Sequence, residues 1–139
     1  MQITRQTEYA VKTLTELGRV PYGQLLSSKV IAQRHNIPED FLHKTIQVLS
    51  RAGLVTTQRG VQGGVRLARS LKKITLADVI EAMEGPIALN VCLGPGFQCD
   101  NLDTCQVRRV LASAQAAMLR ELRKKTLADI VAAEEEAKK

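Results

Sequence analysis

Aromatic residues are scarce in this 139-residue sequence, which has no tryptophan, two phenylalanines and two tyrosines. Proteins that bind single-stranded nucleic acid stack successive bases on aromatic side chains, so the composition argues against that class of partner. The sequence also has no run of eighteen apolar residues, and residues 1–10 contain no apolar core of a signal peptide. These absences predict a cytoplasmic protein with no membrane partner, in which thiols stay reduced.

Acidic residues are scarce in the first half of the chain. Residues 1–75 carry twelve Lys or Arg and four Asp or Glu, a net charge of +8, whereas residues 76–139 carry eight and ten, a net charge of −2. All of the excess positive charge therefore lies in the first half. This asymmetry favours a polyanionic partner, and the shortage of aromatic residues makes duplex DNA the better match.

Cysteines number only three, and all of them lie between Val91 and Val107. An odd number cannot form a complete disulfide framework. Six residues separate Cys92 from Cys99 and five separate Cys99 from Cys105, so the closely spaced cysteine pairs of zinc sites are absent. Thiolates at wider spacings can surround an iron–sulfur cluster, either [2Fe-2S] or [4Fe-4S]. A single metal ion such as zinc and free thiols are the alternatives.

Hydrophobic periodicity predicts three helices in the first fifty residues. Apolar residues recur at helical spacing over residues 7–17, a serine at 27 or 28 can begin a short second helix, and Pro38 opens a third. The third helix would bury either Phe41 or Leu42 and expose a polar face. Two helices joined by a tight turn, the second with a polar outer face, are typical of a helix-turn-helix.

The segment after the third helix predicts a two-stranded β-ribbon. Residues 54–59 and 65–67 have the composition of strands, and they flank the glycine-rich turn 60–64. A ribbon in this place is a wing. We therefore predict a mainly α fold with a small two-stranded β wing, in which residues 1–73 form a winged helix-turn-helix DNA-binding domain.

This domain supplies a set of candidate DNA contacts. Polar residues on the outer face of the third helix would enter the major groove, where a carboxylate can accept a hydrogen bond from cytosine. Cationic residues there and on the wing would mainly contact phosphate, and small residues at the wing tip would let the backbone approach the groove. The expected DNA contacts are Ser28, Glu39, Asp40, His43, Lys44, Gln47, Arg51, Arg59, Gln62, Gly63, Gly64 and Arg66.

A long helix is predicted after the cysteines. It begins at Asp103 or Thr104, runs to about Lys125 and carries one apolar stripe. So long a stripe has too little to pack on within a short chain, and we expect it to pair with its twin in a homodimer. The stripe consists of Val107, Val110, Leu111, Ala114, Met118 and Leu122.

The second half of the chain contains one short sequence twice. Thr75 begins TLADVI and Thr126 begins TLADIV, each with an aspartate placed for a capping box. We interpret the two as independent helix starts, and we expect residues 132–139 to fray. Residues 74–139 thus hold the cysteine loop, 91–106, and the dimerisation helices.

The order of these features resembles one family, the winged-helix transcription regulators of the Rrf2 type, which include IscR-like and NsrR-like iron–sulfur regulators. The resemblance covers essentially the whole chain. Each matching segment is a weak pattern alone, but their order is specific. The segments are MQIT (1–4) with EYAV (8–11), LSRAGLV (49–55), the wing from Arg59 to Gly64, DVI (78–80), the three cysteines and TLAD (126–129).

The resemblance implies a homodimeric regulator, a repressor, that binds a pseudo-palindromic operator in double-stranded DNA. It also implies one iron–sulfur cluster per protomer that senses redox state, nitric oxide, oxygen or iron. Cys92, Cys99 and Cys105 would be its thiolate ligands.

A fourth ligand would complete the cluster. Some family members carry a histidine shortly after the last cysteine, but Val107 and Arg108 stand there in this sequence. NsrR-like members complete the cluster with an acidic residue from the first helix of the other subunit, and Glu8 occupies the matching position. His35 and an exogenous ligand are the alternatives.

Two other functions compete with a cluster regulator. A winged-helix regulator could be switched by its cysteine thiols or by a zinc site, without any cluster. An enzyme is disfavoured, because the sequence contains no convergent acid–base set and no nucleotide-binding motif. We therefore expect no enzymatic activity.

Overall fold

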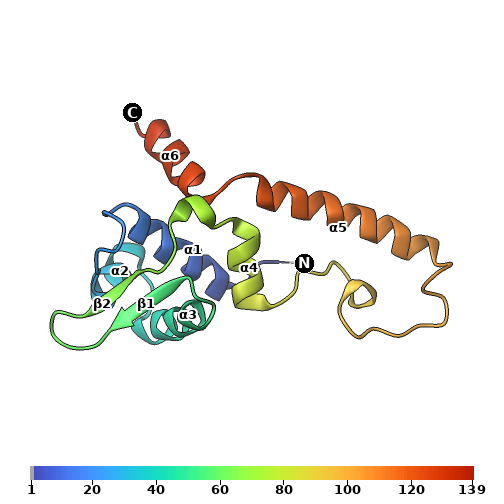
Figure 1. The fold of residues 1–139 in the computed structure, drawn as a ribbon, viewed down its shortest axis with the longest axis horizontal. Coiled ribbons are helices and arrows are strands. Elements are labelled where there is room, and N and C mark those ends of the chain that lie inside the picture. Colours follow the sequence, from blue (N-terminus) through green and yellow to red (C-terminus); the bar gives the residue numbers. More distant parts are fainter. Residues whose placement is uncertain (1) are drawn as a thin grey trace.

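The computed structural model describes residues 2–139 and confirms a mainly helical fold with a small two-stranded sheet. Helices α1 to α4, the wing and α6 form one body, and α5 extends away from it (Figure 1). In chain order the elements are α1 (Arg5–Gly18), α2 (Ser28–His35), α3 (Glu39–Arg51), β1 (Val55–Gln58), β2 (Gly64–Leu67), η1 (Leu71–Lys73), α4 (Leu76–Glu84), η2 (Val91–Leu93), α5 (Gln106–Lys124) and α6 (Leu127–Ala137).

The core of this body is formed by apolar faces of α1 and α3 together with the wing strands. Leu14, Leu42 and Leu49 are fully buried. The choice between Phe41 and Leu42 is resolved because Leu42 faces this core, whereas Phe41 is 51% exposed. Leucines at such positions stabilise the fold by the burial of apolar surface, roughly 2 kcal/mol for each side chain.

The wing is an antiparallel pair in which Val55 lies opposite Leu67 and Gln58 opposite Gly64. A third segment joins it, because the backbone groups of Leu26 and Val65 exchange two hydrogen bonds of 2.9 Å. Val55 and Val65 point into the core and are 1% exposed. The wing is therefore anchored at its base to the segment that precedes α2.

The two TLAD sequences begin separate helices, as predicted, and also lie side by side. Thr75 and Thr126 each form a complete capping box with the aspartate three residues later. Hydrogen bonds from Thr126 hold the pKa of Asp129 below its ordinary value. An antiparallel bridge joins Thr75 to Thr126, and the Leu127 amide donates to the Ile74 carbonyl at 2.7 Å.

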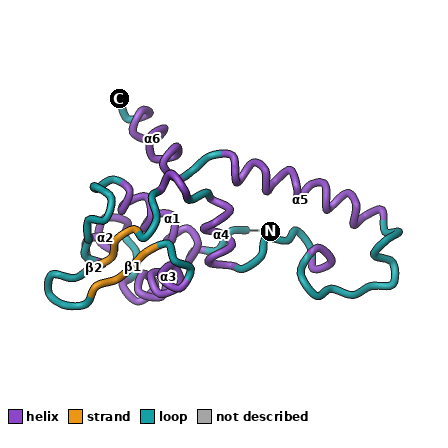
Figure 2. The backbone as a smooth tube through the Cα atoms, in the orientation of Figure 1, coloured by secondary structure: helices purple, strands orange, loops and turns teal. Residues whose placement is uncertain are grey.

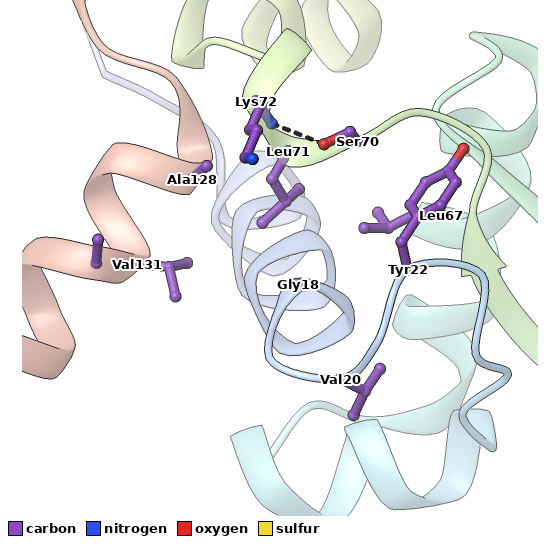
Figure 3. Close-up of a pocket in the computed structure, with 10 residues that line it drawn as sticks. Gly18, Val20, Tyr22, Leu67, Ser70, Leu71, Lys72, Ala128 and Val131 are labelled. Carbon is purple, nitrogen blue, oxygen red and sulfur yellow. Dashed lines mark hydrogen bonds between the residues drawn. The ribbon is translucent and has the colours of Figure 1, made fainter.

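Helix α6 packs on the winged body through its first turns and remains helical to Ala137, past residue 132, where we expected fraying to begin. Leu127 is completely buried in the same core as α1 and α3. Ala128 and Val131 face Gly18 and Leu71 across a shallow groove of about 260 Å³ (Figure 3). The helix continues to Ala137, and Arg19, just after α1, forms ion pairs with Glu134 and Glu135. The core therefore contains residues from both predicted parts of the chain, 1–73 and 74–139.

A buried carboxylate connects three helices of this body. Glu16, near the end of α1, has a side chain only 8% exposed and accepts hydrogen bonds from Arg34 and His35 at the end of α2. Arg19 contacts Glu16 at 3.2 Å and also reaches Glu134 at 3.1 Å in α6. Burial of the Glu16 carboxyl opposes ionisation, yet the hydrogen bonds and charges of Arg34 and His35 together hold its pKa below the ordinary value of 4.5.

Replacing Glu16 by glutamine is expected to lower the free energy of unfolding by about 1–3 kcal/mol at neutral pH, because hydrogen bonds to a charged partner are lost. A carboxyl with a lowered native pKa contributes stability above its unfolded pKa and loses it as the pH falls through the native value. The difference between wild type and Glu16→Gln, measured by urea unfolding, should therefore shrink below pH 4.5. Glu134→Gln, at a half-exposed site, is the control and should change stability little.

Helix α5 and the cysteine loop project from the body (Figure 2). None of the nineteen residues of α5, all of which the structure describes, is buried. The helix begins at Gln106 instead of Asp103 or Thr104, because residues 101–104 form turns and Cys105 occupies the cap. Within residues 2–139, no helix is both long and apolar enough to cross a membrane.

Candidate nucleic-acid interface and cysteine loop

Helices α2 and α3 form the helix-turn-helix. Asn36 ends α2 in the left-handed conformation, with φ of 52°, and thereby turns the chain toward α3. The outer face of α3 presents four exposed polar side chains in a row along the helix: Asp40, Lys44, Gln47 and Arg51. A helix of this kind can lie in a major groove with these side chains toward the bases and the backbone.

A groove separates α3 from the wing. It has a volume of about 690 Å³, and its lining includes Ser28, His43, Arg59 and Gly63. Ser28 Oγ and His43 Nε2 lie 3.5 Å apart across it. The structure thus brings the expected contacts of α2, α3 and the wing to one surface.

The remaining expected DNA contacts also reach the surface. Glu39, Gln62 and Arg66 are exposed, and Arg66 Nε donates a hydrogen bond of 3.2 Å to Thr56 Oγ1 on the neighbouring strand. The Arg66 side chain therefore lies across the wing. Among the twelve expected contacts, only Ser28, Gly63 and Gly64 are half-buried.

Gly63 and Gly64 have a role inside the chain that the sequence did not reveal. A Cβ atom at Gly64 would lie 2.3 Å from the Leu26 carbonyl oxygen, and one at Gly63 would lie 2.0 Å from the Gln58 carbonyl oxygen. These positions accept no side chain without a backbone shift. Their small size is required by the wing itself, whatever lies outside it.

Each of the three cysteines is free, and all lie in the loop from η2 to the start of α5. Cys92 is half-buried and its Sγ accepts a hydrogen bond of 3.4 Å from the Asn90 side chain. Cys105 caps α5, where its Sγ accepts from the Arg108 amide at 3.4 Å. Cys99 is exposed. The thiolate is the form of cysteine that binds metal.

Arg108 connects two of these cysteines. Its amide donates to Cys105 Sγ, and its Nε donates to the Cys92 carbonyl oxygen at 3.3 Å. Arg108 therefore holds the two ends of the loop together. The sequence could not show this role, because the contact depends on how the fold places η2 beside the start of α5.

The two candidate fourth ligands of this chain lie far apart: Glu8 is in the first turn of α1, and His35 ends α2 beside the other end of α1. Glu8, in the first turn, has a side chain 53% exposed and its Oε2 lies 3.9 Å from Arg5 Nε. His35 pairs with Glu16 at the other end of the helix, at 3.0 Å, and its side chain is only 18% exposed. Among residues 2–139, no three His, Cys, Asp or Glu side chains come close enough together to hold a metal ion.

A helix-turn-helix followed by an antiparallel wing defines a winged-helix protein of the DNA-binding class. The chain belongs to the Rrf2 family, described as iron-dependent transcriptional regulators, whose family model matches residues 3–133. Members of this family are transcription regulators and not enzymes. The chain is therefore a regulator of this DNA-binding family.

Individual relatives extend over nearly the whole chain. It is 38% identical to Protein aau3 of Rhizobium meliloti (strain 1021), a match that covers 96% of this chain and 86% of the relative. Its structure is similar to that of T. potens IscR, with a TM-score of 0.78, 29% identity and coverage of 100% and 92% of the two chains. It is also similar to CymR, the global cysteine regulator of B. subtilis, with a TM-score of 0.73, 28% identity and coverage of 95% and 97%.

Proposed function

We propose that this protein is a homodimeric repressor whose binding to a pseudo-palindromic DNA operator is controlled by one iron–sulfur cluster per protomer. The observation that carries the proposal is the placement of all three thiols in one loop between the winged body and α5. Because the loop connects each winged body to the proposed dimerisation helix α5, a change in the loop conformation can alter the position of the two winged bodies relative to each other. The signal would be redox state, nitric oxide, oxygen or iron.

The dimer is proposed to form along α5. The apolar stripe divides into two halves, since Leu111, Met118 and Leu122 are half-buried whereas Val107 and Val110 are 67% and 69% exposed. Met118 and Leu122 line a groove against Ile80 of α4. The exposed half includes Ala114 of the same stripe and continues at helical spacing to Ala117. Small and β-branched side chains of this kind allow two helices to approach closely.

The cysteine loop fits a cluster by the chemistry of its donors. Three soft thiol donors with no disulfide suit iron–sulfur clusters. Cys92 and Cys105 already accept hydrogen bonds at sulfur, as cluster ligands commonly do. Cys92, Cys99 and Cys105 would hold the cluster, which would supply an iron centre reactive toward oxidants and nitric oxide.

Glu8 of the partner subunit is proposed as the fourth ligand. Its carboxylate is exposed on the first turn of α1 and has one distant cationic neighbour, so it is available. A carboxylate is a harder donor than a thiolate and binds the iron of a cluster more weakly. This corner of the site would therefore be the one that opens first. His35 is less available, because Glu16 already binds it.

A thiol-switched regulator is the second candidate. Two observations favour it: the three thiols are not gathered in the single chain described over residues 2–139, and the structure is similar to a global cysteine regulator. In that case, Cys99 would be the reactive thiol, because it is exposed. Zinc bound by the same cysteines belongs to this candidate as well.

The decisive experiment measures iron and acid-labile sulfide per protomer, with the visible spectrum, in protein purified without oxygen. We expect near-equal iron and sulfide in the wild type, loss of both in Cys99→Ala and reduced retention in Glu8→Ala. Glu39→Ala is the matched control, because Glu39 is also an exposed acid in the first turn of a helix. Colourless protein that holds zinc or no metal would contradict the cluster and leave the thiol-switched regulator.

A further inference from the structure

Phe41 is an exposed aromatic residue on the helix proposed to enter DNA. It is the third residue of α3, and 51% of its surface is accessible. Recognition helices contact base edges mainly through their N-terminal residues. The flanking residues Asp40 and Lys44 are exposed as well, so Phe41 lies at the margin of the polar face and not in the core.

The ring is held in a fixed place. Its centroid lies 6.4 Å from that of Tyr9 in α1, at an interplanar angle of 51°. The Lys44 ammonium lies 6.0 Å from the same ring, within the range of a cation–π contact. An apolar side chain fixed by two neighbours has little conformational entropy left to lose when it meets a ligand.

The chemistry of the major groove gives this ring one apolar target. Base edges there present hydrogen-bond donors and acceptors, and the only apolar group is the C5-methyl of thymine, which phenylalanine can contact. We infer that Phe41 reads a thymine methyl group in each half-site. The inference rests on the proposed DNA-binding surface and adds to it an apolar contact with the methyl group, which hydrogen-bonding side chains do not make.

Removal of single methyl groups tests the inference. Wild-type protein prepared without oxygen would first enrich its preferred duplexes from a random pool. Each thymine of the best duplex would then be replaced in turn by uracil, which lacks only the methyl group. We expect one thymine per half-site at which the wild type loses about fourfold in affinity and Phe41→Ala loses nothing, since one buried methyl is worth about that factor.

Lys44→Ala is the control, because Lys44 touches the same ring but is expected to bind phosphate. It should weaken binding to all duplexes and reduce the dependence of binding on salt, while the methyl effect remains. Equal methyl effects in wild type and Phe41→Ala would overturn the inference. So would a shift of Phe41→Ala from dimer to monomer in sedimentation, which would make Phe41 an interface residue. If no duplex is enriched, the DNA-binding surface itself is wrong and the inference falls with it.

Discussion

Val110→Asp is expected to convert the protein from a dimer to a monomer and to weaken operator binding at least about a hundredfold. Val110 is 69% exposed on the outward half of the α5 stripe. In the proposed dimer the aspartates of the two helices would face each other without a cationic partner, and burying such charges is strongly unfavourable. Two linked winged bodies bind two half-sites about 10²–10⁴ times more tightly than one body binds one. Sedimentation and fluorescence anisotropy on a two-fold operator measure the two effects.

Ala116→Asp provides the matched control. Ala116 is exposed on the same helix but lies on its basic side, beside Arg120 and Arg123. The same charge introduced there should leave the dimer intact. If Val110→Asp also stays dimeric, the two chains associate through another surface.

Leu127→Ala is expected to lower the free energy of unfolding by about 2–5 kcal/mol, the usual range for removing a fully buried leucine. Leu127 begins α6, is 0% exposed and belongs to the core that α1 and α3 form. A loss of this size corresponds to a fall in melting temperature on the order of 10 °C for a domain of this length. Urea unfolding and thermal unfolding both measure it.

Leu119→Ala is the corresponding control on α5. Leu119 is only half-buried on a helix that contains no buried residue, so its truncation should be much less costly. A loss below about 1 kcal/mol in Leu127→Ala would contradict the place of α6 in the core, because such a value is typical of a surface position.

The sequence predicted those features that depend on local patterns. The helix-turn-helix and the wing follow from hydrophobic periodicity and glycine placement, which act over a few neighbouring residues. The capping boxes at Thr75 and Thr126 were visible for the same reason. The polar face of α3 could be assigned because a helix fixes which side chains share a side.

Other features depend on contacts between distant segments, and these the sequence did not show. The Leu26 segment lies against Gly64, so a glycine expected to serve DNA contact also serves the wing. Arg108 donates a hydrogen bond to the Cys92 carbonyl because the fold places the start of α5 beside η2. Arg19 pairs with Glu134 of α6, which lies 115 residues further along the chain. The sequence showed the apolar stripe of α5 as one surface, whereas the fold divides it into a half that packs near α4 and a half that is exposed.

The bridge between Thr75 and Thr126 gives the chain a modular character. The fifty residues between them begin with α4, which packs in the winged body; the chain then leaves this body and comes back to the bridge. Topologically, the segment is therefore an insertion in a closed framework. The bridge fixes both ends of such an insertion close together. One insertion could therefore replace another without a change in the position of the flanking residues. The part of the chain that detects a signal could thus diversify, or be grafted by an engineer, while the part proposed to contact DNA keeps its own core.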